Sequence, residues 1–397
     1  MDTQWSTITE QGQVPRSDRL PVGVYLLAFG LFTMGSAEFL MAGVLPSVAT
    51  DLDVSLSSAG ALITAFALGV VLGGPPFAVL SLRWPRRTAL MTTQLVFAAA
   101  VAVGLVTDYW VLLITRFVSG LAYAGFFAVA TVTAISLVTP DRNARASGVV
   151  VSGLSVAMVA GGPLGTLLSH LTEWRGGFWG VVVLTVISTI ACAFGLPATK
   201  SAAKPSVRRE LGTMRKPRLW GVYAATILST AAYMITFNYL AALAADVTGV
   251  SEAWIPAVLS LFGVGAFVGL SIGGRISDRR PRQALLLGAI GIAVLSVLLA
   301  VFAGNPAAVV PIVFLLGIAA FVLNPALYGR VFTIAADAPT LAGATTVSAF
   351  QLGISLTPVF AAAALALGAP VTSVSWIGAV LALVTIPFIL LDRDRAS

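Results

Sequence analysis

The sequence predicts an all-α membrane protein of about twelve transmembrane helices, arranged as two six-helix halves. Three observations lead to this prediction. First, 58% of the residues are hydrophobic and only 10% are charged, whereas a soluble domain carries about 25% charged residues. Second, the apolar residues are gathered in runs of about 20, the length that crosses the hydrocarbon core of a bilayer. Third, the two halves of the chain resemble each other.

Twelve apolar runs follow one another, with turn and charge signals in the breaks between them. The first run is too long for the apolar part of a signal peptide, so it is predicted to remain as a span. The predicted spans cover 22–45, 57–80, 88–107, 110–137, 147–169, 177–197, 219–244, 254–274, 283–303, 307–332, 341–367 and 372–391.

The distribution of basic residues over the loops predicts the orientation. If alternate loops lie on opposite sides, 21 of the 23 Lys and Arg residues fall on one side. The exceptions are Arg116, which lies within a span, and Arg175. Because cytoplasmic loops carry the excess of Lys and Arg, both termini are predicted to be cytoplasmic in a bacterial inner membrane.

One long hydrophilic stretch in the interior divides the chain between the sixth and seventh spans. The predicted units are an N-terminal six-helix half with its cytoplasmic tail at 1–198, a basic cytoplasmic linker at 199–218, and a C-terminal six-helix half at 219–397. Next to a bilayer, the bases of the linker suit anionic headgroups better than nucleic acid.

An internal repeat supports this division. After a shift of 196 residues, Phe66-x-x-Gly69-x-x-x-Gly73 falls on the matching pattern at 262–269, and the loop 78–87 falls on 274–283. A six-span unit that is duplicated in the same orientation is typical of proteins that hold a substrate between two halves.

The second copy of this loop, Gly274-Arg-Ile-Ser-Asp-Arg-Arg-Pro-Arg282, resembles the loop 2–3 signature of the major facilitator superfamily. The stretch 116–120, Arg-Phe-Val-Ser-Gly, resembles the span 4 signature of its drug:proton antiporters, and 161–165 resembles their span 5 signature. More narrowly, the stretches 35–46, 81–87, 125–129 and 173–179 are similar to bacterial chloramphenicol-resistance exporters. Sugar and nucleoside exporters share several of these stretches.

The first copy of the loop departs from the family pattern, because Leu82 and Pro85 replace the usual Asp and Gly. In the family this Asp latches the cytoplasmic side shut, so the resemblance implies that Asp278 is the surviving latch. The alternative is that Asp278 only balances the neighbouring arginines. Residues expected to serve the conformational change are Asp278, Arg279, Arg83, Arg86, Gly161, Pro163 and Gly165.

Only two ionisable residues lie well inside predicted spans, Glu38 in the first and Arg116 in the fourth. A charge at the bilayer centre costs about 2.5–3.5 kcal/mol, so each is a functional hypothesis by default. At about 1.5 Å per residue, both lie roughly 12 Å below the outer surface. The resemblance implies that both helices line the cavity. We expect Glu38 to carry a proton and Arg116 to control it; a static pair is the alternative.

Aromatic, thioether and amide side chains on the spans expected to form the cavity suit a neutral aromatic ligand. For each single aromatic residue, packing in the core or against lipid is the alternative. The candidates are Met34, Met41, Tyr123, Phe127, Tyr233, Phe237, Asn238, Phe321, Asn324 and Tyr328.

A single histidine (His170) and a single cysteine (Cys192) exclude a disulfide framework and a Cys/His metal cluster. We expect neither an enzyme nor a cofactor. The predicted function is proton-coupled efflux of a small, largely neutral amphipathic compound by a monomer, with a chloramphenicol-type antibiotic as the best candidate. Its partners would be protons, substrate and the lipid bilayer, without nucleic acid. Export of sugars or nucleosides is the main alternative, followed by an uptake symporter and a non-transporting sensor.

Overall fold

The computed structural model describes residues 20–80, 84–139, 142–196, 212, 214–277, 279–336 and 339–392. Twelve helices within these ranges are long and apolar enough to cross a membrane, and the same residues contain no β-strand. The predicted number of spans and the all-α class are therefore confirmed.

The first helix set consists of six spans. They are α1 (Val22–Asp51), α2 (Leu56–Leu80), α3 (Arg86–Leu105), α4 (Tyr109–Ser136), a broken span of α5 (Asn143–Val156), a π-helical turn (Ala157–Gly161) and α6 (Gly162–Leu171), and α7 (Trp174–Gly195).

The second helix set also has six spans. They are α9 (Pro217–Asn238) with α10 (Leu240–Ala242) and a π-helical turn (Leu243–Val247), α11 (Ile255–Ser277) preceded by a 3₁₀ turn (Glu252–Trp254), α12 (Pro281–Val301), α13 (Pro306–Val322) followed by α14 (Asn324–Ile334), α15 (Pro339–Ala366) and α16 (Ser373–Leu391).

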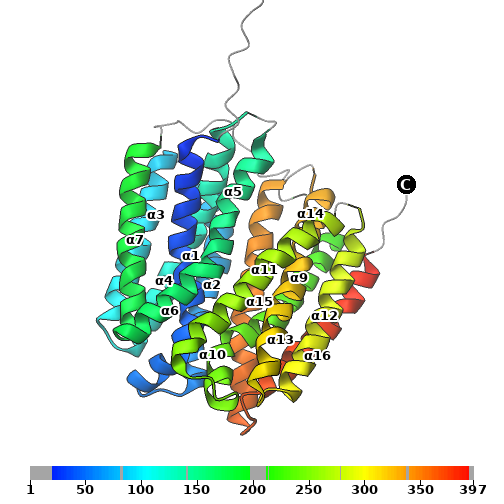
Figure 1. Ribbon diagram of the computed structural model, residues 1–397. Helices are drawn as coiled ribbons and strands as arrows, with labels where there is room; N and C mark the ends of the chain where they lie inside the picture. The colour runs from blue at the N-terminus through cyan, green and yellow to red at the C-terminus, as the bar shows by residue number, and fades with distance from the viewer. Residues whose placement is uncertain are drawn as a thin grey trace, which may run out of the picture.

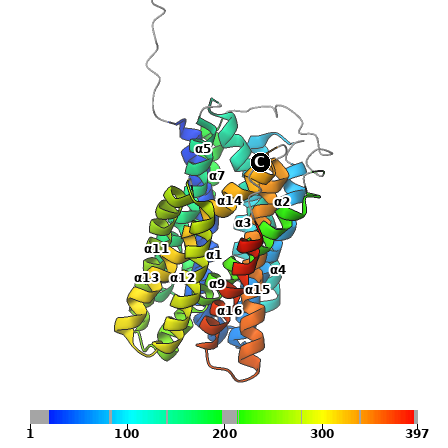
Figure 2. The ribbon, with the colours of Figure 1, turned by 90° about the vertical axis from the view of Figure 1, so that its right-hand side faces the viewer.

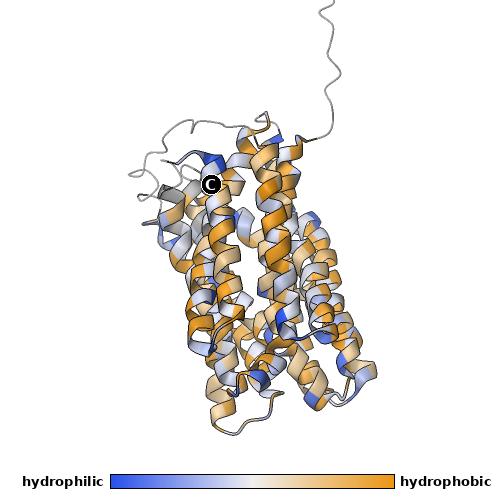
Figure 3. Ribbon diagram, turned by 90° about the vertical axis from the view of Figure 1, so that its left-hand side faces the viewer, coloured by the Kyte–Doolittle hydropathy of each residue, from blue (hydrophilic) through white to orange (hydrophobic). Residues whose placement is uncertain are grey.

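The two helix sets lie side by side, the first on the left and the second on the right of Figure 1. Helix α1 begins and α16 ends at the same end of the bundle, which we name the terminus end; the opposite end is the far end (Figure 2). Apolar residues cover the helices, and the most hydrophilic residues lie mostly near the two ends (Figure 3). Exposed apolar side chains of this kind suit a hydrocarbon solvent.

Glycine contacts bear out the internal repeat in three dimensions. Gly69 of α2 packs against the backbone of α4, and Gly265 of α11 packs in the same way against α13, since a Cβ on either would collide with a carbonyl oxygen of the partner helix. Gly120 on α4 and Gly317 on α13 make the reciprocal contacts. The repeat therefore corresponds to a helix pair, with a shift of 196 residues between α2 and α11 and of 197 between Gly120 of α4 and Gly317 of α13.

The two helix sets touch mainly toward the far end. Helix α2 packs along α15. Helix α11 packs on α6 and on the π-helical turn Ala157–Gly161, and it has only marginal contact with α5. The Thr64 hydroxyl donates to the Ser355 carbonyl oxygen at 3.0 Å. A Cβ on Gly60 would lie 3.1 Å from the Cβ of Pro358. The contact of α11 with the fifth span is thus confined to one end, whereas α2 and α15 stay in contact as far as Val71 and Ser348, where the Ser348 hydroxyl donates to the Val71 carbonyl oxygen at 3.3 Å.

The first span is longer than predicted, because α1 continues through Pro46 to Asp51. Side chains from the start of α7 hold its far end: the Trp174 indole N–H donates to the Asp51 carboxylate at 3.0 Å, and Arg175 pairs with the same carboxylate at 2.8 Å. An interior proline breaks one backbone hydrogen bond, which neighbouring helices allow in a membrane span.

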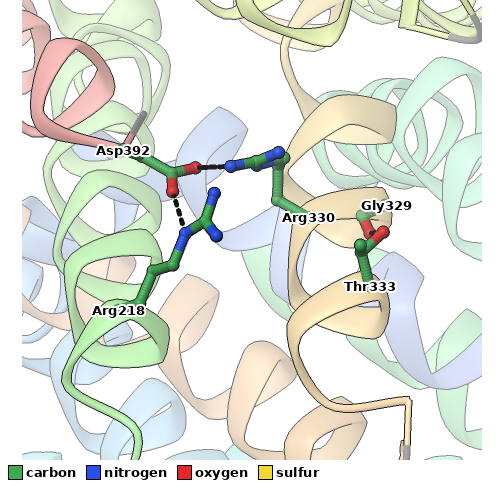
Figure 4. Close-up of polar contacts among 5 residues, drawn as sticks. All are labelled: Arg218, Gly329, Arg330, Thr333 and Asp392. Carbon is green, nitrogen blue, oxygen red and sulfur yellow. Dashed lines mark hydrogen bonds and ion pairs between the residues drawn. The ribbon is translucent and has the colours of Figure 1, made fainter. Parts of the chain in front are cut away.

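An ion cluster ties three spans of the second helix set together at the terminus end (Figure 4). Asp392, just after α16, accepts from Arg218 of α9 at 2.7 Å and from Arg330 of α14 at 2.7 Å. The Asp392 and Arg330 side chains are only 11% exposed, so this cluster is more than a solvated surface pair.

Candidate proton and substrate site

Glu38 lies near the middle of α1 and is buried, with 8% of its surface exposed. Its carboxylate oxygen Oε1 accepts a hydrogen bond from Nε2 of Gln351 at 3.0 Å. Gln351 belongs to α15, so this bond joins the first helix set to the second. The buried carboxyl is therefore placed where the two sets meet.

Arg116 of α4 is also buried, with 3% exposed. Its Nε donates to the carbonyl oxygen of Leu62 and its NH1 donates to that of Ala37, both at 3.4 Å. The guanidinium carbon lies 4.6 Å from the centre of the Phe66 ring, within the range of a cation–π contact. These contacts fix the guanidinium between α1, α2 and α4.

Glu38 and Arg116 are neighbours without being a close ion pair. Among the described residues, no nitrogen of Arg116 lies within 4.0 Å of a Glu38 carboxylate oxygen, yet the two charges interact electrostatically. Arg116 instead binds the backbone of Ala37, the residue that precedes Glu38. Because α1 extends to Asp51, Glu38 lies about 20 Å from the end of its helix, deeper than the sequence predicts.

Some of the predicted cavity residues gather around Glu38 from both helix sets. The Glu38 carboxyl interacts electrostatically with the hydroxyls of Tyr123 on α4 and Tyr233 on α9. Tyr233 packs on Phe321 with ring centres 5.4 Å apart, and Tyr328 packs on Phe350 at 5.3 Å. Phe127 lies beside Tyr123, with ring centres 6.4 Å apart.

Asn324 provides an unsatisfied acceptor in this region. It begins α14, where the tenth span breaks, and it is 7% exposed. Its Oδ1 is buried without a hydrogen-bond partner. Buried polar atoms are rarely left unpaired, so this oxygen is suited to accept a hydrogen bond from a ligand or a water molecule.

Other predicted cavity residues take part in packing. The Phe237 ring contacts Phe262 of α11 at 4.9 Å and Phe39 of α1 at 6.0 Å between ring centres, which joins the two helix sets. Asn238 donates to the Thr357 hydroxyl of α15 at 2.8 Å. Met34 of α1 is fully buried.

A narrow cavity lies on the Arg116 side of the first helix set. Its volume is about 10 Å³ and its lining includes Met41, Arg116, Ser119 and Trp174. A space of this size holds about one water molecule. Arg116 has five N–H donors, and the two carbonyl oxygens accept from only two of them. A water molecule in this cavity would accept a hydrogen bond from one of the others.

The predicted conformational residues fall into three groups. Asp278 and Arg83 lie outside the described residues. Arg279 is exposed, whereas Arg86 at the start of α3 is buried. In span 5, Gly161 and Gly165 pack against α1, where a Cβ on Gly161 would collide with Ser36. The π-helical turn lies just before Pro163.

Sequence reasoning missed Gln351 and Phe66. Gln351 carries no charge, so only its position as an amide within an apolar span could have singled it out. Phe66 was recognised as part of the repeat, but the repeat does not show that its ring lies under the Arg116 guanidinium.

A bundle of twelve spans built from two repeated sets is the architecture of a membrane transporter. Residues 27–358 match the Major Facilitator Superfamily, and the chain belongs to this family. It is 40% identical over 351 residues to the chloramphenicol resistance protein of Streptomyces lividans, which covers 87% of this chain and 90% of that protein.

Two further comparisons are useful. A protein named "probable sugar efflux transporter" from Helicobacter pylori is 27% identical over 334 residues, or 83% of this chain and 85% of that protein. The fold is similar to the crystal structure of a bacterial homologue of the human lysosomal transporter Spinster, inward-facing and unoccupied, with a TM-score of 0.69, 18% identity, and coverage of 95% and 96% of the two chains.

Proposed function

We propose that this protein exports a small, largely neutral amphipathic compound in exchange for protons, and that a chloramphenicol-type antibiotic is its substrate. The observation that carries the proposal is Glu38, a buried carboxyl that contacts both helix sets. The similarity to the chloramphenicol resistance protein supports the substrate class. The neighbouring rings of Tyr233 and Phe321, with the unpaired oxygen of Asn324, suit an aromatic ligand with hydrogen-bond donors.

The proposed coupling uses Glu38 as the proton carrier and Arg116 as the charge that controls it. Burial favours the neutral form of a carboxyl and a nearby cation favours the ionised form. A movement that changes water access or the Glu38–Arg116 distance therefore binds or releases a proton. For a neutral substrate exchanged against one proton, about 100 mV supplies roughly 2.3 kcal/mol and one pH unit adds about 1.4 kcal/mol. Together they sustain a gradient of a few hundred-fold.

The proposed cycle is a rocking of residues 1–198 against 219–397 around this site, with residues 199–218 as a cytoplasmic linker. Most of that linker lies outside the described residues. The basic loops support cytoplasmic termini. Reporter fusions at Asp246 and Lys204 test the topology, and they should report opposite sides of the membrane. The conformational roles of Asp278, Arg279, Arg83, Arg86, Gly161, Pro163 and Gly165 belong to the same proposal.

The direct test is chloramphenicol uptake into inverted membrane vesicles under an imposed proton gradient. The wild-type chain should accumulate the antibiotic, and a protonophore should abolish the accumulation. Glu38→Gln keeps the size and hydrogen bonding of the side chain but cannot cycle a proton, so it should bind chloramphenicol without concentrating it. If Glu38→Gln still builds a gradient that collapses with a protonophore, the proton site is elsewhere.

Sugar efflux is the second candidate, supported by the similarity to the Helicobacter relative. A sugar would bring hydroxyl donors, for which the unpaired Oδ1 of Asn324 is an acceptor. Growth of a sensitive host on an antibiotic panel separates the two candidates. Unchanged chloramphenicol tolerance, with the protein correctly inserted, would favour sugar efflux.

A further inference from the structure

The hydrogen bond between Glu38 and Gln351 is unusual in its position. Helix α15 packs on α2 and α9 rather than along α1, so two long side chains span the space between α1 and α15. Both ends are buried, with 8% of Glu38 and 5% of Gln351 exposed. Any movement that separates the two helix sets at this level must lengthen or break the bond.

The amide of Gln351 can bond to Glu38 in either protonation state. An ionised carboxylate only accepts hydrogen bonds, whereas a protonated one also donates, and a glutamine amide offers both donors and an acceptor. In this structure Nε2 donates to Glu38, and Oε1 of the same amide is buried without a partner. Turning the amide over would present that free oxygen to a protonated Glu38.

The two versions of the bond differ in strength. A hydrogen bond to an ionised carboxylate is roughly twice as strong as one between neutral groups. Protonation of Glu38 would therefore keep the two side chains in contact but weaken the link between α1 and α15. Protonation of Glu38 would thus make it easier for α1 and α15 to separate.

The other groups that face Glu38 come from a few elements. Arg116 and Tyr123 project from α4, and Tyr233 projects from α9. Within their described residues, the remaining helices packed on α1 contribute no charged group at this level; Arg145 of α5 and Arg175 of α7 lie toward the two ends of the bundle. Gln351 is the direct hydrogen-bond partner of the Glu38 carboxylate.

We propose that Gln351 is the positioning residue through which the protonation state of Glu38 reaches the second helix set. The proposal rests on the proposed role of Glu38 as the proton carrier. Gln351 acts by holding the ionised carboxylate against α15, and it releases that hold in part when the carboxylate is neutralised.

The test is a distance measurement that needs no substrate. The full chain carries Cys192→Ser, which removes its single cysteine, and spin labels at Thr50→Cys and Leu367→Cys. Both positions are exposed at the far end, one on α1 and one just after α15. Distances between the labels are recorded in lipid nanodiscs between about pH 5 and pH 9, an interval that covers the shifts known for buried carboxyls.

Four versions of the labelled chain are compared: the parent, Glu38→Gln, Gln351→Leu and Ser355→Ala. Ser355 is the matched control, because it lies one turn from Gln351 on α15 and its hydroxyl bonds only to the Leu352 carbonyl oxygen of the same helix. The parent and Ser355→Ala should show the same pH-dependent change in distance. Glu38→Gln should show none.

Gln351→Leu should reduce the amplitude of this change, because the hydrogen bond that carries it to α15 is gone, and should move the midpoint of any remaining change to higher pH by about one unit, the size expected for the loss of one charge-assisted hydrogen bond. If Gln351→Leu has the same midpoint and amplitude as Ser355→Ala while Glu38→Gln is insensitive to pH, the role of Gln351 is refuted, but the role of Glu38 as the proton carrier is supported. If Glu38→Gln keeps the full response, the proton site itself is wrong and the role of Gln351 falls with it.

The isosteric variant Gln351→Glu covers the case in which Gln351→Leu fails to insert. Two carboxyls at this distance do not readily ionise together, so the pair keeps one proton between them. The midpoint of the pH-dependent change in distance should therefore again move to higher pH. A response identical to that of the parent would overturn the proposal.

Discussion

At the scale of single residues, the guanidinium of Arg116 combines three contacts that an ammonium group cannot reproduce together. It donates to the carbonyl oxygens of Leu62 and Ala37, and its carbon lies 4.6 Å from the centre of the Phe66 ring, within the range of a cation–π contact. The planar fork of arginine allows this, whereas lysine is a compact point charge.

We therefore expect Arg116→Lys to keep the positive charge but to lower the initial rate of uphill export by about tenfold or more, which corresponds to the loss of at least one charged hydrogen bond of about 1.5–3 kcal/mol. Transport into inverted vesicles measures the rate, and the amount of protein in the membrane is the control. A wild-type rate with Arg116→Lys would mean that only the charge matters.

The residue scale also shows what the sequence can reveal. Glu38 and Arg116 are recognisable because a charge within an apolar span is costly. The contact between the two helices cannot be recognised from the sequence, because Arg116 donates to the backbone carbonyl oxygen of Ala37 rather than to the Glu38 carboxylate. Likewise, Trp174 and Arg175 lie in a stretch that resembles chloramphenicol exporters, yet in the structure they hold Asp51 at the end of α1.

At the scale of helices, close packing within each set depends on glycines, and α11 offers a matched pair. A Cβ on Gly265 would collide with the carbonyl oxygen of Phe314, whereas a Cβ on Gly274 of the same helix meets nothing within 4 Å. Gly265→Ala should cost about 1–3 kcal/mol of stability, the usual cost of overpacking. Gly274→Ala should be neutral or slightly stabilising. Thermal melting in detergent compares them, and equal melting temperatures would contradict this packing.

The ion cluster at the terminus end gives a second prediction for helices. Asp392→Asn removes the negative charge that Arg218 and Arg330 share. We expect the stability to fall by roughly 1–2 kcal/mol, less than for a fully buried pair because Arg218 is 41% exposed and screened by solvent. High salt should narrow the difference between the variant and the wild type. A melting temperature that does not change at any salt concentration would mean that the Asp392 carboxylate does not help to hold α9, α14 and α16 together.

The helices themselves are the most predictable part of the molecule. Length and hydropathy are sufficient to find twelve spans, because a segment that crosses lipid must pair all its backbone N–H and C=O groups internally and therefore forms a long apolar helix. The interruptions are harder to predict. The π-turn before Pro163 follows a visible signal, but the continuation of α1 through Pro46 depends on contacts at Asp51 that come from a distant part of the chain.

At the scale of the whole molecule, the contacts between the helix sets gather toward the far end. Gly60 and Pro358 lie there on α2 and α15, and a Cβ on Gly60 would be 3.1 Å from that of Pro358. A disulfide needs a Cβ–Cβ distance of about 3.5–4.5 Å, so one can form between these positions if the Tyr239 hydroxyl, which would lie 2.6 Å from a Cβ on Gly60, moves aside. Such a bond would fix the far end in its closed form.

The proposed rocking cycle requires the far end to open once in each turnover. In a Cys192→Ser background, oxidation of Gly60→Cys/Pro358→Cys should therefore reduce export to the level of empty vesicles, and a reducing agent should restore it. Each single cysteine variant is the control, because it carries the same local change without the bond. Substrate binding from the terminus end should survive oxidation, since the bond leaves Glu38 and its neighbours in place. Full export by the oxidised double variant would show that the far end need not separate at α2 and α15, and the two helix sets would then have to move in another way.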